Sequence, residues 1–424
     1  MITYRAHWIL PMADDPIRNG SVTLREGRIV SVNAHAAHGA IDLGRAVILP
    51  GLVNAHTHLE LSYLHERVPL AQQFGDWVRT VMETRREYPD PADARIVEPA
   101  RTAIARARTA GTALLGEVSN TLVTVPLLAE AGMPAQVFHE LTGFTEQDPE
   151  ARVREARARA DAYAADPLVG RPVMGRRGAI RISVAPHAPY SVSAALFRAI
   201  RADLDAHEQA VSSVHLGENP EEVELLFRGT GVIRAVLEDL GRWPSDWRPP
   251  GVGPVEYLSD LGVLDARMLA VHGVQFDGED LTRLRALGVT LVSCPRSNRY
   301  VGVGDPPLEA FYAMNVDVAF GTDSLASVAD LNLFAELAQA RRIAPRVPAR
   351  RLLESATLVG ARALGFGDDF GSVEVGKSGA LIAVPVPDGV SDVEEYLLSG
   401  VEPGDVIWLD SETPNSQSPT PNPR

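Results

Sequence analysis

The stretch Val47 to His58, VILPGLVNAHTH, is a run of apolar and β-branched residues that ends in two histidines. Such a run is typical of a parallel strand that is buried on both faces. Seven more runs of this kind follow, and most precede a segment rich in alanine, arginine, leucine and glutamate. They are Thr112–Val118, Gln136–Leu141, Ile180–His187, Val211–His215, Met268–Val274, Val289–Cys294 and Val316–Thr322. Eight strand-and-helix units predict an α/β protein with a (β/α)8 TIM-like barrel.

The length of the chain, 424 residues, fits a barrel of about 250 residues with an appended module. An open doubly wound sheet is the alternative. It rarely needs eight strand-and-crossover units, and no G-x-G-x-x-G motif follows the first strand. The barrel is therefore the favoured architecture, and we expect it to occupy residues 50–365.

The two ends of the chain have a different texture. Short strands separated by glycines are expected within residues 1–49, and the segment Gly371 to Pro385 has the same pattern. We therefore expect residues 1–49 and 366–410 to form one small β-sandwich domain. Residues 411–424 are serine, threonine, proline and asparagine with almost no apolar residue, which predicts a disordered tail.

Two rare residue types exclude several classes of protein. The single cysteine, Cys294, excludes a disulfide within the chain. The single lysine, Lys377, excludes a Schiff-base enzyme, a P-loop nucleotide site or a lysine-bridged metal pair unless that residue lies at the site.

Net charge and hydropathy point to small-molecule chemistry. The chain carries 55 acidic and 40 basic residues, and its net charge of −15 argues against nucleic acid as a partner. The sequence has no run of about 18 apolar residues, so no membrane span is expected. The apolar stretch within residues 1–15 is too short for the core of a signal peptide. We expect a cytoplasmic protein with a small-molecule substrate.

Polar residues gather where the predicted strands end. Five of the 11 histidines lie there, at positions 56, 58, 187, 215 and 272. His56 and His58 are two residues apart on one strand, so their rings point to the same side. With His215 and Asp323 they make a set of three nitrogens and one oxygen, which suits a catalytic zinc or iron with a position left for water. Zinc is the expected metal, and iron(II) is the alternative.

These motifs resemble the amidohydrolase superfamily, in particular its aminohydrolase and chlorohydrolase branch. The matching stretches are PGLVNAHTH (50–58), HLGE (215–218), VHG (271–273), SCPRSN (293–298) and GTDS (321–324). The resemblance covers about residues 1–390. Within the branch, HTHLELS and APHAPYS look most like the 6-aminodeoxyfutalosine deaminases of menaquinone biosynthesis, which implies a deaminase of an adenine nucleoside with an aryl carboxylate on its 5′ side.

The resemblance also implies roles for individual residues. His56, His58, His215 and Asp323 would bind one divalent metal. Glu218 would move protons between water and the ring, His272 would hold the attacking water or the leaving group, and Asp323 would accept a proton. The superfamily's two-metal subtype needs a lysine at the end of the fourth strand, where this chain has APHAPY (185–190), so one metal is expected.

The sequence is less specific about which residues contact the substrate. The resemblance suggests His187, and Trp77 in the loop after the first strand. Glu60, two positions after the histidine pair, either hydrogen-bonds ribose hydroxyls or caps the loop. An arginine would suit a substrate carboxylate, with Arg299, Arg296 and Arg228 as candidates. Residues 229–254 form a long excursion that either covers the site or is a plain surface insertion.

Three functions remain open. The first is the nucleoside deaminase. The second is a related ring hydrolase that acts on guanine, S-adenosylhomocysteine or a chlorinated triazine, with the same ligands. The third is an inactive scaffold, against which the intact set of polar residues argues. The sequence leaves a monomer and a homodimer open.

Overall fold

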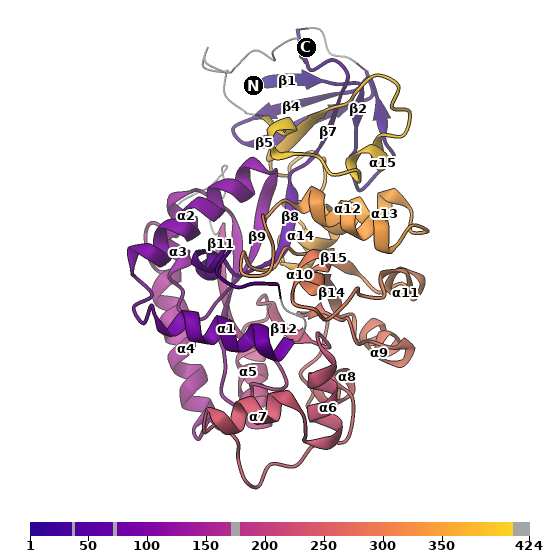
Figure 1. The fold of residues 1–424 in the computed structure, drawn as a ribbon. Helices are drawn as coiled ribbons and strands as arrows, with labels where there is room; N and C mark the ends of the chain where they lie inside the picture. The colour runs from indigo at the N-terminus through magenta and orange to yellow at the C-terminus, as the bar shows by residue number, and fades with distance from the viewer. Residues whose placement is uncertain (36–38, 71–73, 171–178, 410–424) are drawn as a thin grey trace.

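The computed structural model describes residues 1–35, 39–70, 74–170 and 179–409. Strands from both ends of the chain lie together, beside a larger region in which helices surround parallel strands (Figure 1). The predicted disordered tail, residues 411–424, lies outside the described residues.

The strands near the termini form two sheets. The first has the order β5-β4-β1-β6 and the second the order β17-β16-β7-β2-β3. β16 pairs antiparallel with β7, so that Leu381 lies opposite Pro50, and this pairing joins the two ends of the chain. Tyr4 and Leu24 of the first sheet share a buried apolar cluster with Ile48 and Leu381 of the second. The strands are β1 (Ile2–Arg5), β2 (Trp8–Ile9), β3 (Ile17–Arg18), β4 (Ser21–Arg25), β5 (Arg28–Asn33), β6 (Ile41–Asp42), β7 (Ala46–Pro50), β16 (Leu381–Pro385) and β17 (Ile407–Leu409).

The larger region contains eight parallel strands in two sheets of four. The orders are β11-β10-β9-β8 and β12-β13-β14-β15. Each of the eight predicted runs overlaps one of these strands. The strands are β8 (Leu52–Thr57), β9 (Thr112–Ser119), β10 (Ala135–Leu141), β11 (Ile180–Pro186), β12 (Ser212–Leu216), β13 (Met268–His272), β14 (Thr290–Ser293) and β15 (Val318–Phe320).

The first predicted strand, Val47 to His58, is two strands. β7 belongs to the terminal sheet and β8 to the parallel sheet, and the chain passes between them at Gly51. A Cβ at Gly51 would lie 2.6 Å from the Cβ of Ala113, so only glycine fits this close approach. Periodicity could not show the break because both strands are fully buried.

The two parallel sheets meet at two seams. Thr57 bridges to Asp323 in parallel at the first seam. At the second, the N–H of His215 donates to the carbonyl oxygen of His187 at 2.8 Å, and Ser212 Oγ donates to the carbonyl oxygen of Val184 at 3.0 Å. The described parallel strands therefore pair as two four-stranded sheets, and the predicted continuous eight-stranded barrel is not resolved.

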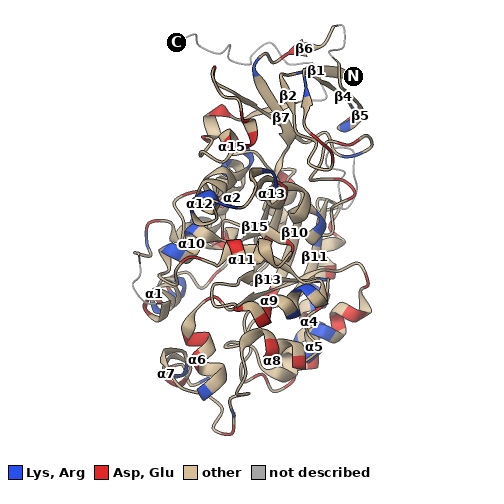
Figure 2. Cartoon of the chain, turned by 90° about the vertical axis from the view of Figure 1, so that its right-hand side faces the viewer, with Lys and Arg blue, Asp and Glu red and all other residues tan. Residues whose placement is uncertain are grey.

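Helices cover the outside of the parallel strands, and helices such as α4 and α5 carry both basic and acidic residues (Figure 2). No helix in the described ranges has both the length and the apolarity needed to cross a membrane. The helices are α1 (Phe74–Arg86), α2 (Ala94–Thr109), α3 (Thr124–Glu130), α4 (Pro149–Ala164), α5 (Ala194–Ala206), α6 (Pro220–Arg228), α7 (Val232–Asp239), α8 (Pro254–Asp260), α9 (Gly278–Leu287), α10 (Pro295–Tyr300), α11 (Leu308–Ala313), α12 (Leu333–Ile343), α13 (Ala349–Glu354), α14 (Gly360–Ala363) and α15 (Val393–Leu397). Shorter turns are η1 (Leu59–Leu64), the π-helical η2 (Ser355–Val359) and η3 (Pro403–Asp405).

Candidate metal centre and substrate cavity

The polar residues at the ends of the parallel strands face one cavity of about 1130 Å³. Helices α1 and α7 give it an apolar wall that includes Trp77, Val81, Ile233 and Leu237. The excursion after the fifth strand therefore does reach the site, because α7 is part of it. The strand-end residues that line the cavity are His58, Glu140, His187, His215, Glu218, His272 and Asp323.

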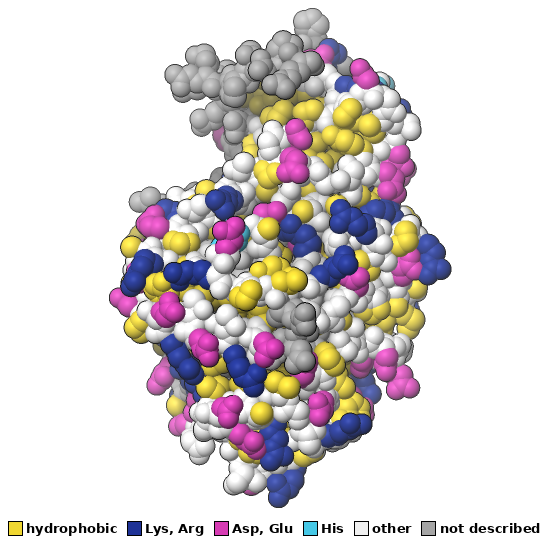
Figure 3. All heavy atoms as spheres, in the orientation of Figure 1, with side chains coloured by type: hydrophobic (Ala, Val, Ile, Leu, Met, Phe, Trp, Pro, Cys, Tyr) yellow, Lys and Arg dark blue, Asp and Glu magenta, His cyan; other side chains and the backbone are white. Residues whose placement is uncertain are grey.

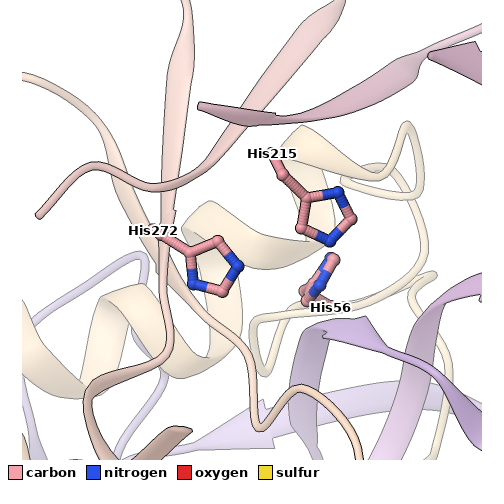
Figure 4. A group of neighbouring side chains, drawn as sticks. All are labelled: His56, His215 and His272. Atoms are coloured by element: carbon pink, nitrogen blue, oxygen red, sulfur yellow. The ribbon is translucent and has the colours of Figure 1, made fainter. Parts of the chain in front are cut away.

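Three predicted metal ligands converge at the base of this cavity. Nε2 of His58 lies 3.2 Å from Nε2 of His56 and 3.2 Å from Nε2 of His215. Figure 4 shows the rings of His56, His215 and His272, which come from β8, β12 and β13, turned toward one another. Ligands with bonds of about 2.0–2.1 Å to a tetrahedral zinc lie about 3.3 Å apart, so the histidine spacing fits a metal ion.

The electrostatics of the cluster keep the histidines neutral. Burial, and then the neighbouring His187, lowers the pKa of His58 and that of His215 to about 3. Burial and the other histidines lower the pKa of His56 well below its usual value. Neutral imidazoles have lone pairs to give to a cation. Nδ1 of His215 lies 3.1 Å from the carbonyl oxygen of His187, which leaves Nε2 to face the cluster.

Asp323 brings a carboxylate to the same point. Its Oδ1 lies 3.6 Å from Nε2 of His58 and 3.8 Å from Nε2 of His56. Its Oδ2 accepts a hydrogen bond from Ser297 Oγ at 2.6 Å, which orients the carboxylate. The backbone of Asp323 has φ of +63°, a conformation that costs free energy in a residue with a Cβ and is found at functional sites.

Glu218 and His272 lie beside the histidine cluster. Oε1 of Glu218 is 3.7 Å from Nε2 of His272. Burial, and then the charge of Asp323, raises the pKa of Glu218 well above its usual value. Nδ1 of His272 lies 2.8 Å from Oδ1 of Asn298, an acceptor, so Nδ1 carries the hydrogen and Nε2 has the lone pair. A carboxylate with a raised pKa is a stronger base than usual, which suits proton transfer.

Two of the expected substrate residues line the cavity. His187 follows β11, and its Nδ1 lies 2.6 Å from Ser191 Oγ. Trp77 is half-buried on α1, and its Nε1 donates to the carbonyl oxygen of Ala326 at 3.4 Å.

The other two lie outside the cavity lining. Glu60 is buried because η1 turns it toward the end of β9, where it accepts hydrogen bonds from Ser119 Oγ at 2.7 Å and Thr121 Oγ1 at 2.8 Å. Arg299 is 58% exposed on the outer face of α10, with its Nε 3.5 Å from Asp305 Oδ1. Arg296 is also occupied, since its Nε donates to Glu336 Oε1 at 2.6 Å.

The structure adds polar residues that sequence reasoning missed. Arg85 of α1, Asn120 after β9 and Glu140 at the end of β10 all line the cavity. Asn120 and Glu140 could have been found by the rule that identified the histidines, since both lie where predicted strands end. Arg85 had no such signal because it lies in a helix that follows the first strand.

Comparison with known proteins places the chain in a family. Residues 47–401 match the amidohydrolase family, and the chain belongs to it. The expected class of enzyme, a hydrolase that acts on C–N bonds, is confirmed.

Two relatives illustrate the range of similar enzymes. An aminodeoxyfutalosine deaminase from Deinococcus radiodurans is 30% identical over 77% of this chain and 76% of its own length. A 5-methylthioadenosine/S-adenosylhomocysteine deaminase from Teredinibacter turnerae is 28% identical over 90% of this chain and 84% of its own length.

Solved structures agree with the fold. An adenosine deaminase from Xanthomonas campestris with bound zinc is 27% identical, with a TM-score of 0.77 over 96% of this chain and 90% of that one. The aminofutalosine deaminase of Helicobacter pylori in complex with methylthio-coformycin has a TM-score of 0.81 over 96% of this chain and 100% of that one, at 23% identity.

Proposed function

We propose that this protein is a metal-dependent aminohydrolase that removes the ring amino group of an adenine nucleoside as ammonia. The observation that carries the proposal is the convergence of three imidazole Nε2 atoms and the Asp323 carboxylate beside Glu218 in one cavity. The deaminases among the relatives support the same reaction. An inactive scaffold would have no need of this set.

We assign His56, His58, His215 and Asp323 as ligands of one divalent metal. Zinc is favoured by the zinc-bound adenosine deaminase from Xanthomonas campestris, and iron(II) is the alternative. A bound metal of this kind lowers the pKa of a water ligand to about 7. The only lysine, Lys377, donates to the carbonyl oxygen of Gly367, away from the cavity, which supports one metal rather than a lysine-bridged pair.

The side chains around the ligands supply the proton transfers. Glu218 takes a proton from the attacking water and gives it to the ring nitrogen next to the carbon that carries the amine. That protonation lets the ring lose its aromaticity as the C–O bond forms. His272 holds the water or the departing ammonia, and Asp323 accepts the second proton of the water and passes it to the amine. The amine then leaves as ammonia and the ring carbon becomes a carbonyl.

The best candidate substrate is 6-aminodeoxyfutalosine, which would place the protein in menaquinone biosynthesis. The Deinococcus radiodurans relative supports it. The cavity exceeds the usual range of about 300–1,000 Å³, so it has room for a nucleoside with a large 5′ group. Arg86, Arg152 and Arg242 line it, and guanidinium groups suit a carboxylate. They replace Arg299 as candidates for that contact.

The second candidate is a 5-methylthioadenosine/S-adenosylhomocysteine deaminase, which the Teredinibacter turnerae relative favours. Guanine and chlorinated triazines would use the same ligands and differ only in the contacts of the cavity wall.

We also infer that the eight parallel strands enclose one core as a (β/α)8 barrel, with residues 50–365 as one domain. The two seams between the sheets, at Thr57 and Asp323 and at His187 and His215, support this closure. Residues 1–49 and 366–410 would form the β-sandwich domain.

A substrate panel tests the proposal. The zinc-loaded protein is incubated with 6-aminodeoxyfutalosine, 5-methylthioadenosine, S-adenosylhomocysteine, guanine and a chlorotriazine, and ammonia or chloride release is measured. We expect ammonia from the adenine nucleosides, with the highest kcat/KM for 6-aminodeoxyfutalosine. Metal bound at one equivalent without release from any nucleoside would overturn the proposal.

A further inference from the structure

Glu140 is a buried carboxylate that faces the cavity with spare acceptor capacity. Its side chain is 5% exposed, and it lies at the end of β10. Oε2 accepts a hydrogen bond from Asn120 Nδ2 at 2.8 Å. Within the described ranges, Oε1 receives no hydrogen bond. Oε1 lies 3.4 Å from Nδ1 of His215, and that nitrogen is already directed at the carbonyl oxygen of His187. Each carboxylate oxygen has room for about two donors, so Oε1 is open to a ligand.

Arg85 adds donors next to this acceptor. Its Nη2 donates to Oδ1 of Asn120 at 3.1 Å and lies 3.6 Å from Oε1 of Glu60. These are the hydrogen bond and the ion pair of its guanidinium in the described part of the chain, and the group has five N–H donors. The side chain is 37% exposed and lines the cavity. One asparagine therefore ties an open acceptor, Glu140, to an arginine with open donors.

Glu60 explains why this arrangement is held in place. It is buried, and it accepts the backbone N–H of Asn120 at 3.1 Å as well as the hydroxyls of Ser119 and Thr121. The residue that sequence reasoning assigned to ribose hydroxyls thus lies behind the wall and positions Asn120 and Arg85.

We propose that Glu140 and Arg85, bridged by Asn120, form a subsite for the vicinal hydroxyls of the substrate's sugar. The carboxylate repels an anionic ligand and the guanidinium repels a cationic one. A diol suits both groups, because its hydroxyls donate hydrogen bonds to the carboxylate and accept them from the guanidinium. The subsite adjoins His215 and His187, so it lies beside the reacting ring rather than at the mouth of the cavity. The inference rests on the proposed function and adds that the enzyme selects nucleosides through the sugar.

The experiment compares two substrates and four proteins. Adenosine and 2′,3′-dideoxyadenosine are assayed with zinc-loaded wild type, Glu140→Gln, Arg85→Gln and the control Glu146→Gln. Glu146 lines the same cavity, but its Oε1 is already held by the backbone N–H groups of Gln147 and Asp148. Metal content is measured for each protein.

Glu140→Gln and Arg85→Gln should each lower kcat/KM for adenosine by about 10- to 100-fold, which is the loss expected for hydrogen bonds that involve a charged group. Both should leave kcat/KM for the dideoxy nucleoside within about twofold, and Glu146→Gln should change neither. Equal losses on both nucleosides would overturn the subsite and indicate a merely structural role.

A binding measurement separates this proposal from the proposed function. Inosine and 2′,3′-dideoxyinosine are titrated calorimetrically into the zinc-loaded wild type and Glu140→Gln. If inosine binds more tightly than 2′,3′-dideoxyinosine only when Glu140 is present, the subsite is supported. If no nucleoside then releases ammonia, deamination is refuted while the subsite is retained. Equal affinity of wild type for the two ligands would overturn the subsite whatever the activity.

Discussion

Replacing Glu218 by glutamine tests the proton transfers directly. The amide keeps the size of the side chain but cannot take a proton from water. Oε1 of Glu218 lies 3.7 Å from Nε2 of His272, and Glu218 is not one of the residues whose ligand atoms converge at the metal centre. The metal should therefore stay bound at one equivalent while kcat falls. General acid–base groups contribute about 10²–10⁴-fold to rate, so we expect a loss of that size, equal to about 3–5.5 kcal/mol in the barrier.

The assay follows ammonia release under saturating 6-amino purine nucleoside, with zinc content measured on the same samples. Glu224→Gln is the matched control, because Glu224 lies on α6, the helix that begins two residues after Glu218, outside the cavity lining, and accepts a hydrogen bond from Thr230 Oγ1 at 2.8 Å. It should keep near-normal turnover. A Glu218→Gln protein that retains both zinc and a near-normal rate would remove Glu218 from the mechanism.

Three further predictions concern the metal, pH and packing. His58→Ala should weaken zinc binding by more than about 100-fold in a chelator competition, because loss of a metal ligand costs more than loss of a residue that only hydrogen-bonds to a ligand. His187→Ala should keep its zinc. Equal zinc affinities of the two variants would contradict the ligand assignment. Burial raises the pKa of Glu222 from 4.5 to about 8. The folded protein therefore holds the proton of Glu222 more tightly than the unfolded chain does. The contribution of this group to the free energy of unfolding is lost as the pH rises from about 4.5 to about 8. Glu222→Gln should then raise Tm relative to wild type at pH 8.5 and leave it nearly unchanged at pH 4.5, and a Tm difference independent of pH would refute the assignment. Gly116→Ala should destabilise the fold by about 1–3 kcal/mol in urea unfolding, because a Cβ there would lie 2.2 Å from the carbonyl oxygen of Ala55, whereas Gly278→Ala, with open space around it, should not.

Much of the architecture was predictable because burial leaves a simple pattern. Parallel strands with both faces covered appear in the sequence as apolar runs, and each of the eight predicted runs overlaps a parallel strand. The histidines and Asp323 were predictable because the carboxyl ends of such strands meet at one edge. The break at Gly51 was not, since it depends on the close approach of Ala113, which is distant in sequence.

The cavity wall was harder to predict than its base. Glu60 and Arg299 were expected to face the substrate, but the direction of a side chain after a strand depends on the turn that follows. η1 turns Glu60 toward Ser119, and α10 presents Arg299 to solvent. Arg85 reaches the cavity only because α1 packs over the strand ends, and single-sequence patterns carry no signal for that packing. In Figure 3, cationic and anionic side chains are mixed over the visible surface, so charge on that face does not mark the site either.

The most direct test of the account is a zinc titration of metal-free protein, in which ammonia release from an adenine nucleoside is measured at each step. We predict that activity rises linearly and reaches its plateau at one zinc per chain. Absence of ammonia release at full zinc occupancy would contradict the proposed reaction. An activity plateau reached only at two zinc ions per chain would contradict the single metal centre built from His56, His58, His215 and Asp323.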